Sequence, residues 1–194
     1  MSTERSTIYA RFRERILAFF RTLPLALERD DLRVVHACWN DGMISFAGNS
    51  SSVPSLHQEH VNRIDCEIQS RADLDGIDEG LLHQNENPVK MLTSGPEERS
   101  GEPIEAGGMT RYERRVEWWK EYRGGLFCVF GHYSLAEGRI RSSCSAFCVD
   151  YGVGKRARER RAGKAVSLSR WLAALRFPER VVVFDNGLTY RCGN

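Results

Sequence analysis

Two histidines each follow a short apolar segment that has the length and composition of a buried strand. Val34-Val35 precedes His36, and Val129-Phe130-Gly131 precedes His132. A histidine just beyond the carboxyl end of a strand can direct a ring nitrogen toward an ion shared with a neighbouring strand. Either histidine alone is better explained as a hydrogen-bonded core or loop residue than as a metal ligand. Only the pair, taken with its surroundings, indicates a metal site at the edge of a sheet.

The surroundings resemble three late motifs of the calcineurin-like metallophosphoesterases. These are His-Ala after a strand at 36–37, Gly-His-Tyr at 131–133 and Phe-Cys-Val-Asp-Tyr-Gly at 147–152. In the bacterial phosphoprotein-phosphatase-like branch a segment similar to Ala-Leu-Arg-Phe-Pro-Glu, here at 174–179, follows them. The likeness extends from about Phe19 to Phe184. It implies an α/β fold, part of an αββα sandwich with mixed sheets and outer helices, in a single domain over 1–194.

The early motifs of that family are not found in this sequence. They are Gly-Asp-x-His, Gly-Asp-x-x-Asp-Arg-Gly and Gly-Asn-His-Glu or Gly-Asn-His-Asp, and they supply the first metal's ligands, the bridging aspartate, an asparagine ligand and the histidine that protonates the leaving group. The resemblance therefore implies a carboxy-terminal portion of the metallophosphoesterase domain. We expect its metal centre to be incomplete and the activity of the isolated chain to be weak or absent.

The resemblance also implies the chemistry of the site. Two metal ions roughly 3.5–4 Å apart would activate a bridging water and polarise the phosphoryl oxygens for in-line displacement. His36 and His132 would both bind one ion, and Asp150 would orient a ligand from a neighbouring strand. Imidazole suits manganese, or a zinc and iron pair, better than magnesium. Asn40 and Asp41, just after His36, are weaker candidates for lining the cleft.

Arginines at 111 and 115 are candidates for binding phosphate. The segment Met109 to Tyr122 has the composition of a helix, and residues four apart on a helix share one face. An arginine fork matches phosphate geometry, and the family has a phosphate-binding arginine in this stretch, which favours Arg115 and, after it, Arg111. The alternative is that both pair with nearby glutamates on a solvated surface. Trp118 and Trp119 in the same segment are expected to pack into the core.

The most basic segment is Lys155 to Lys164. We expect a solvated loop between two strands. Attraction of phosphate near the mouth of the cleft and a nucleic-acid surface are the alternatives. Cys144 and Cys148 have a spacing that could hold a soft metal, but buried thiols in a strand are the simpler interpretation.

Periodicity and turn residues predict the remaining elements. Helices are expected at Thr7 to Thr22, Leu56 to Ile68 and the acidic run to Leu82, a tight turn at Asp41-Gly42, and a flexible loop over 93–108. Mainly one sheet is expected from the strands at Leu25 to Val35, Leu126 to Phe130, Ala146 to Asp150, Ala165 to Leu172 and Arg180 to Phe184.

Composition indicates an ordinary globular protein. With 28 basic and 26 acidic residues the net charge is only +2, which gives no general attraction to nucleic acid or membrane. The six cysteines do not have the density of a disulfide scaffold or a zinc-ribbon spacing. No apolar run approaches the roughly 20 residues of a membrane span, so no bilayer crossing and no membrane partner are expected. Arg21 and Pro24 interrupt the apolar stretch Ile16 to Leu27, and an acidic segment follows it instead of a cleavage site, so a signal peptide is not expected and the predicted location is the cytoplasm.

Three functions remain open from the sequence. The preferred one is a metal-dependent phosphoesterase acting on a phosphoprotein, a dinucleoside polyphosphate or an RNA end, completed by an upstream half-protein. The second is a non-catalytic module that binds phosphate or nucleic acid and needs no metal. The third is a decayed remnant whose uncovered sheet edge would promote aggregation.

Overall fold

The computed structural model describes residues 2–106, 109–134, 143–163 and 171–192, and within them the chain is mixed α/β. The helices are α1 (Ser2–Thr22), α2 (Asp41–Gly48), α3 (Val53–Gln69), α4 (Gly76–Asn85), α5 (Pro88–Ser94), α6 (Val153–Arg161) and the 3-10 helix η1 (Trp118–Lys120). The strands are β1 (Ala26–Glu28), β2 (Leu32–Val35), β3 (Glu97–Ala106), β4 (Met109–Arg115), β5 (Phe127–Phe130), β6 (Ala146–Cys148), β7 (Ala173–Arg176), β8 (Val181–Phe184) and β9 (Thr189–Arg191).

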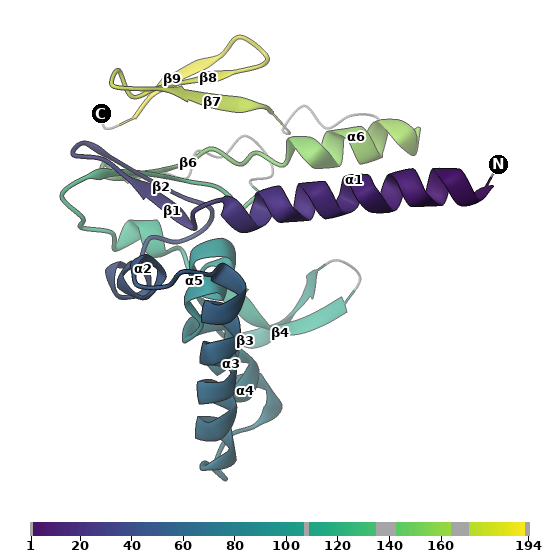
Figure 1. Ribbon diagram of the computed structural model, residues 1–194. Helices are drawn as coiled ribbons and strands as arrows, with labels where there is room; N and C mark the ends of the chain where they lie inside the picture. The colour runs from purple at the N-terminus through teal and green to yellow at the C-terminus, as the bar shows by residue number, and fades with distance from the viewer. Residues whose placement is uncertain (1, 107–108, 135–142, 164–170, 193–194) are drawn as a thin grey trace.

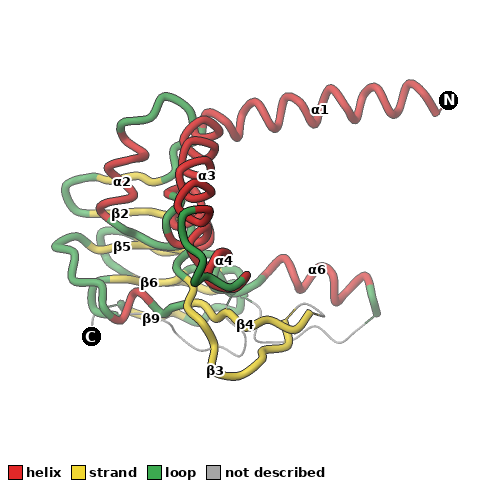
Figure 2. Tube along the Cα trace, turned by 90° about the horizontal axis from the view of Figure 1, so that it is seen from below, coloured by secondary structure: helices red, strands yellow, loops and turns green. Residues whose placement is uncertain are grey.

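The largest sheet has the strand order β1-β2-β5-β6, and β2, β5 and β6 run parallel. Val34 lies opposite Val129, and Phe130 lies opposite Cys148. All four residues of β5 are buried, as expected for a central parallel strand covered on both faces. The three strands end at the same edge of the sheet, so the loops that follow them meet there (Figure 2).

The strands at the end of the chain form a separate antiparallel sheet, β7-β8-β9. The expectation of mainly one sheet is therefore wrong for the strand at 181–184. Two short connections fold residues 173–191 back on themselves, so β8 pairs with β7 and β9. This sheet contacts β6 through the rings of Phe147 and Tyr190, whose centroids are 5.8 Å apart. Most of the strand expected at 165–172 lies outside the described residues.

Polar side chains begin the helices that lie below the large sheet in Figure 1. Asn40, Ser52, Asp75 and Asn87 each accept a hydrogen bond from a backbone N–H in the first turn of α2, α3, α4 and α5. The helices predicted near 7–22 and 56–68 are confirmed as α1 and α3. The tight turn predicted at Asp41-Gly42 is wrong, because the Asn40 cap starts α2 there.

The segment Met109 to Tyr122 is a strand followed by a 3-10 turn, so the predicted helix is wrong. Residues 97–106 form strand β3, so the loop expected over 93–108 is also corrected. Opposite charges face each other across this β3–β4 hairpin, which stabilises the pairing. The pairs are Glu97 with Arg115, Glu98 with Arg114 and Arg99 with Glu113.

The basic segment after β6 is helical over 155–161, so the loop expected there is wrong, whereas residue 164 lies outside the described residues. Helix α6 begins after Gly152, which has the left-handed φ of 65° that glycine adopts without strain. Arg156 on its first turn pairs with Asp185 at the end of β8. This ion pair fixes the helix against the small sheet.

Aromatic side chains fill the core between the large sheet and the helices. Trp119 stacks on Phe130 with ring centroids 5.1 Å apart, and Tyr133 contacts both rings. The core positions expected for Trp118 and Trp119 are confirmed, since they are 8% and 1% exposed. The Trp118 indole N–H donates to the carbonyl oxygen of Ala37 at 2.9 Å. This bond fixes the loop that follows β2.

Both α1 and α6 extend past the edge where the parallel strands end (Figures 1 and 2). In Figure 1, β7, β8 and β9 lie above the large sheet and α2 to α5 lie below it, while β3 and β4 extend toward the same side as α1 and α6. None of the helices in the described ranges has the length and apolar character needed to cross a membrane.

Candidate functional site

The carboxyl ends of β2, β5 and β6 bring together three of the residues singled out from the sequence. His36 follows β2, His132 follows β5 by two residues, and Asp150 follows β6 by two residues. The N–H of Gly131 donates to the carbonyl oxygen of His36 at 2.9 Å. A Cβ atom at Gly131 would lie 3.4 Å from that oxygen and 3.6 Å from the Cβ of Asp150, which are ordinary contact distances, so the three loops meet at this residue.

The two histidine rings lie in contact. Their centroids are 5.3 Å apart and their planes make an angle of 57°. His36 is exposed, whereas His132 is half-buried and has a positive φ of 67°. Left-handed backbone is uncommon for a residue other than glycine, and such conformations cluster at functional sites. The arrangement expected from the sequence is therefore present in the structure, whereas metal binding by the pair stays a prediction.

The Nε2 atom of His132 is buried and has no hydrogen-bond partner within the described residues. A buried polar atom without a partner costs about 1–3 kcal/mol, and a bound metal ion would offset this cost. Burial lowers the pKa of His132 below the usual 6.5, the Arg115 cation and the neighbouring His36 lower it further, and Asp150 opposes them. The neutral imidazole that results is the form that binds metals.

Arg115 reaches the same site from the end of β4. Its Nη1 donates to the carbonyl oxygen of His132 at 3.2 Å, and its guanidinium carbon lies 5.7 Å from the centre of the Tyr133 ring. The side chain is exposed apart from these contacts, so the rest of its fork faces solvent beside the histidines. This position suits the predicted role in binding a phosphoryl oxygen.

Arg111 does not share this position. In β4 it lies opposite Ile104, four residues before Arg115, and strand geometry separates the two by about 13 Å along the chain. The helical spacing that grouped the two arginines is absent. Within the described residues, only Arg115 of this pair contacts the His132 loop.

Asp150 holds the loops of the site through backbone groups. Its Oδ1 accepts a hydrogen bond from the N–H of Gly152 at 2.8 Å, and its Oδ2 accepts one from the N–H of Ser134 at 3.3 Å. Ser134 is two residues after His132, so Asp150 connects the histidine loop to the start of α6. These bonds support a positioning role for Asp150.

Asn40 and Asp41 are used locally. Asn40 caps α2, and the Oδ1 of Asp41 accepts from the indole N–H of Trp39 at 2.9 Å. Cys148 is buried in β6, while Cys144 is exposed before the strand begins. Across the described residues, no three histidine, cysteine or acidic side chains form a group that could hold a metal ion. The structure thus provides two imidazole donors, which fit part of a metal site.

Tyr133 is a residue of the site that the sequence analysis missed. Its hydroxyl donates to the carbonyl oxygen of Val116 at 3.1 Å, and its ring lies against Gly95, where a Cβ atom would overlap the hydroxyl oxygen. Tyr133 therefore connects the end of α5, the segment after β4 and the histidine loop. The only signal in the sequence is its place in Gly-His-Tyr.

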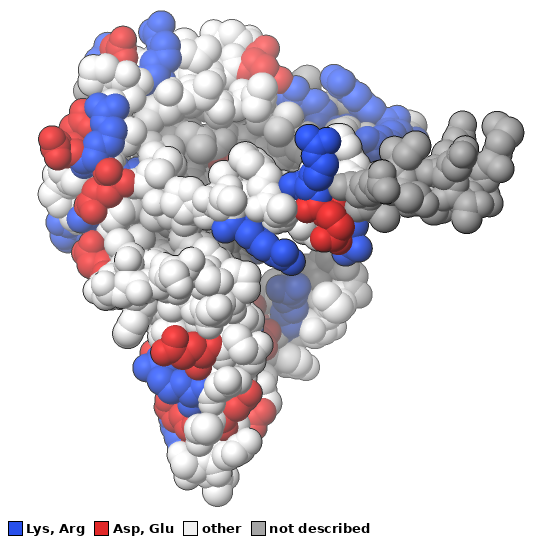
Figure 3. Space-filling model, viewed as in Figure 1, with Lys and Arg blue, Asp and Glu red and all other residues white. Residues whose placement is uncertain are grey.

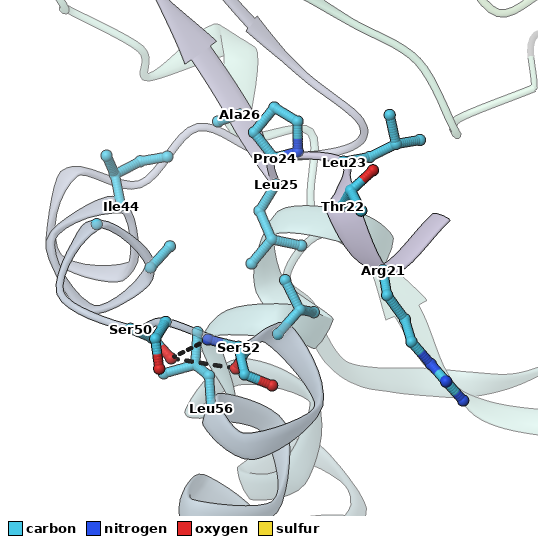
Figure 4. Close-up of a pocket in the computed structure, with 14 residues that line it drawn as sticks. Arg21, Thr22, Leu23, Pro24, Leu25, Ala26, Ile44, Ser50, Ser52 and Leu56 are labelled. Atoms are coloured by element: carbon cyan, nitrogen blue, oxygen red, sulfur yellow. Dashed lines mark hydrogen bonds between the residues drawn. The ribbon is translucent and has the colours of Figure 1, made fainter. Parts of the chain in front are cut away.

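An apolar pocket of 410 Å³ lies beside His36. Residues from β1 and the segment before it, from β2 and from β5 line it, among them Leu25, Val34 and Val129. A second pocket, of 340 Å³, lies between the end of α1 and the connection from α2 to α3 (Figure 4). Ser50 and Ser52 hydrogen-bond to each other at its wall, and it contains none of the predicted site residues.

Comparison of the chain with protein-family models, with curated proteins and with solved structures gives no match. The resemblance to metallophosphoesterases therefore stays a prediction.

Proposed function

We propose that this chain is a metal-dependent phosphoesterase, and that its sheets β1-β2-β5-β6 and β7-β8-β9 are part of the αββα sandwich of the calcineurin-like enzymes. One observation carries the proposal. His36 and His132 lie in contact at the carboxyl edge of a parallel sheet, with a buried, unpartnered Nε2 on His132. Ligands commonly bind at this edge in open α/β sheets.

Each residue of the site has a distinct role in this proposal. His36 and His132 donate nitrogen lone pairs to one divalent ion, with manganese, or zinc and iron, as the metals that suit imidazole. Arg115 binds a phosphoryl oxygen of the substrate, and Asp150 keeps the histidine loop in place. A divalent metal bound here would supply an acidified water and polarise the phosphoryl group.

Two imidazoles make only part of such a centre. We propose that the bridging carboxylate and the other ligands come from a segment or a partner polypeptide outside the residues described. The substrate is then a phosphorylated molecule, either a phosphoprotein, a dinucleoside polyphosphate or an RNA end. The proposed location is the cytoplasm.

The first test is manganese binding, measured by titration calorimetry, with His36→Ala, His132→Ala and the control His57→Ala on α3. We expect each site variant to weaken manganese binding at least tenfold. Removal of one of the two metal ligands should weaken binding more than removal of a residue that only orients a ligand. His57→Ala should bind as the unaltered chain does. Equal binding by all four proteins would contradict the proposed site.

Hydrolysis of p-nitrophenyl phosphate with manganese is the second measurement. It compares this chain with a form extended upstream to any in-frame Gly-Asp-x-His motif. Activity that appears only in the extended form and is lost in His36→Ala supports a phosphoesterase completed by upstream residues. Activity in the short form that depends on His36 would show that its site needs nothing further.

A non-catalytic module that binds phosphate or nucleic acid is the second candidate. It is favoured by the lack of a third metal-ligand side chain near the histidines in the described ranges, and by the basic helix α6. Phosphate or nucleic-acid binding that persists in EDTA, without hydrolysis by either form, would favour it.

A further inference from the structure

Helix α6 is the most basic element of the structure. Five of its nine residues are lysine or arginine and one is glutamate. Figure 3 shows their blue side chains gathered over α6. Arg156 is bound on the inner side, because both guanidinium nitrogens Nη1 and Nη2 donate to the Asp185 carboxylate. The helix is thus fixed by one arginine and has the others available to a partner.

Three exposed cations follow one side of this helix. Lys155, Arg158 and Arg161 recur every third residue, a spacing that places side chains along one side of an α-helix. The ion pairs between residues that the structure describes involve none of the three. At 1.5 Å per residue they form a row about 9 Å long with a spacing of about 4.5 Å. We call these three residues the basic row.

The basic row begins beside the histidine site. The N–H of Gly152, the residue before α6, donates to Asp150, and Asp150 also binds the backbone of Ser134 in the histidine loop. Lys155 is three residues further along the chain. A ligand lying along the row would therefore have one end close to His132.

The form of the row indicates its partner. A single phosphate is bound by side chains that converge, whereas a row of cations matches a line of negative charges such as a phosphodiester backbone. An anionic membrane fits less well, because a helix on a membrane surface needs a wide apolar face, and Val153 is the only large apolar residue of α6. The helix has no aromatic residue to stack on bases, so binding would not depend on sequence.

We propose that the basic row of α6 binds the sugar–phosphate backbone of a nucleic-acid strand. The strand would lead to the His36–His132 site, so the substrate would be a phosphate ester on a nucleic acid. This last step rests on the proposed phosphoesterase function, whereas the binding surface does not.

The test is fluorescence anisotropy with a labelled, single-stranded 20-mer of deoxythymidine, titrated with the full chain in EDTA between 50 and 200 mM salt. The variant is Lys155→Gln/Arg158→Gln/Arg161→Gln. The matched control, Arg29→Gln/Arg71→Gln/Arg123→Gln, removes the same charge from exposed positions outside α6. Circular dichroism and thermal unfolding establish that all three proteins are folded.

We expect the α6 variant to bind at least tenfold more weakly at 50 mM salt. The slope of log K against log salt should fall in magnitude by about 2, since each lost phosphate contact on a single strand contributes about 0.7. The control should stay within about threefold of the unaltered chain. Equal losses in both variants would overturn the proposal, as would binding to phosphatidylserine vesicles but not to the oligonucleotide.

The double variant His36→Ala/His132→Ala separates the two proposals. It should keep oligonucleotide binding, because the basic row is intact. Oligonucleotide binding that depends on α6, in a protein with no metal-dependent hydrolysis, supports the nucleic-acid surface and contradicts the proposed phosphoesterase function. Hydrolysis that depends on His36, in a protein whose oligonucleotide binding does not depend on α6, supports the phosphoesterase function and contradicts the nucleic-acid surface.

Discussion

The environment of His132 disfavours the protonated imidazole. The ring is partly buried, the Arg115 guanidinium binds the carbonyl oxygen of the same residue, and the ring of His36 is in contact. Burial is the largest cause of the lowered pKa, and the Arg115 cation is the next. These causes can be separated by mutation, because Arg115 is exposed and its removal leaves the burial unchanged.

We expect the pKa of His132 in the metal-free chain to lie below 6.5, and Arg115→Gln to raise it without restoring that value, because burial remains. Arg111→Gln is the matched control, because a charge about 13 Å further along β4 is screened at physiological salt. The measurement is an NMR titration of the imidazole proton resonances in EDTA. A midpoint above 6.5 in the unaltered chain would contradict the expected environment.

The lowered pKa of His132 also determines how the stability of the fold changes with pH. The unfolded chain, with a histidine pKa near 6.5, binds this proton more readily than the folded chain does. The free energy of unfolding therefore decreases as pH falls below about 6.5 and is unaffected by His132 above it. The free energy of unfolding in urea should differ less between pH 8 and pH 5 for Arg115→Gln than for Arg111→Gln.

The position of Arg115 could be predicted from the sequence only through the resemblance. Composition favoured a helix over Met109 to Tyr122, and in a helix Arg111 would have been equally well placed. The β3–β4 hairpin depends on charge pairs between segments about 16 residues apart, such as Glu98 with Arg114. The helix or strand propensity of one segment does not show which other segment it pairs with. Gly107-Gly108, which can form a tight turn, was the available hairpin signal.

At the scale of elements, the parallel strands could be predicted best. Runs such as Leu126 to Phe130 are apolar because both faces of β5 are covered, so the sequence has a strong signal. The ends of these strands determined where His36 and His132 lie. Helix α6 had no such signal, because its side chains are nearly all polar and its contact with the body depends on Asp185, 29 residues after Arg156.

We expect Asp185→Asn to release α6 from the small sheet. The hydrogen bond from Arg156 holds the pKa of Asp185 below its usual value, so the contact is complete near neutral pH and is lost as pH falls through that lowered pKa. Amide hydrogen exchange at pH 7 should become faster in α6 and stay unchanged in β5. Asp73→Asn, which removes another exposed carboxylate paired with an arginine, should leave exchange in α6 unchanged. Unchanged exchange in Asp185→Asn would show that α6 is held by other contacts.

At the scale of the whole molecule, exposed apolar side chains gather on α1, the helix that Figure 2 shows leaving the body. Phe19 and Phe20 are each 58% exposed, and Phe12 is 61% exposed. The apolar pocket beside His36 begins directly after this helix, at Leu23. Apolar side chains gathered on one element form a patch, and a patch promotes association more than scattered exposed residues do.

We expect this patch to cause concentration-dependent self-association of the isolated chain and to bind the dye ANS. Phe19→Ser/Phe20→Ser should reduce both, while the urea midpoint changes little, because these side chains contribute little buried area and serine and phenylalanine have similar helix propensities. Leu172→Ser/Leu188→Ser removes two apolar side chains with 57% and 56% exposure from the small sheet and serves as the matched control. Sedimentation velocity and ANS fluorescence give the result. If the control reduces association as much as the α1 variant does, general surface hydrophobicity is responsible. If only the α1 variant does so, the surface at the end of α1 is a specific contact face next to the histidine site.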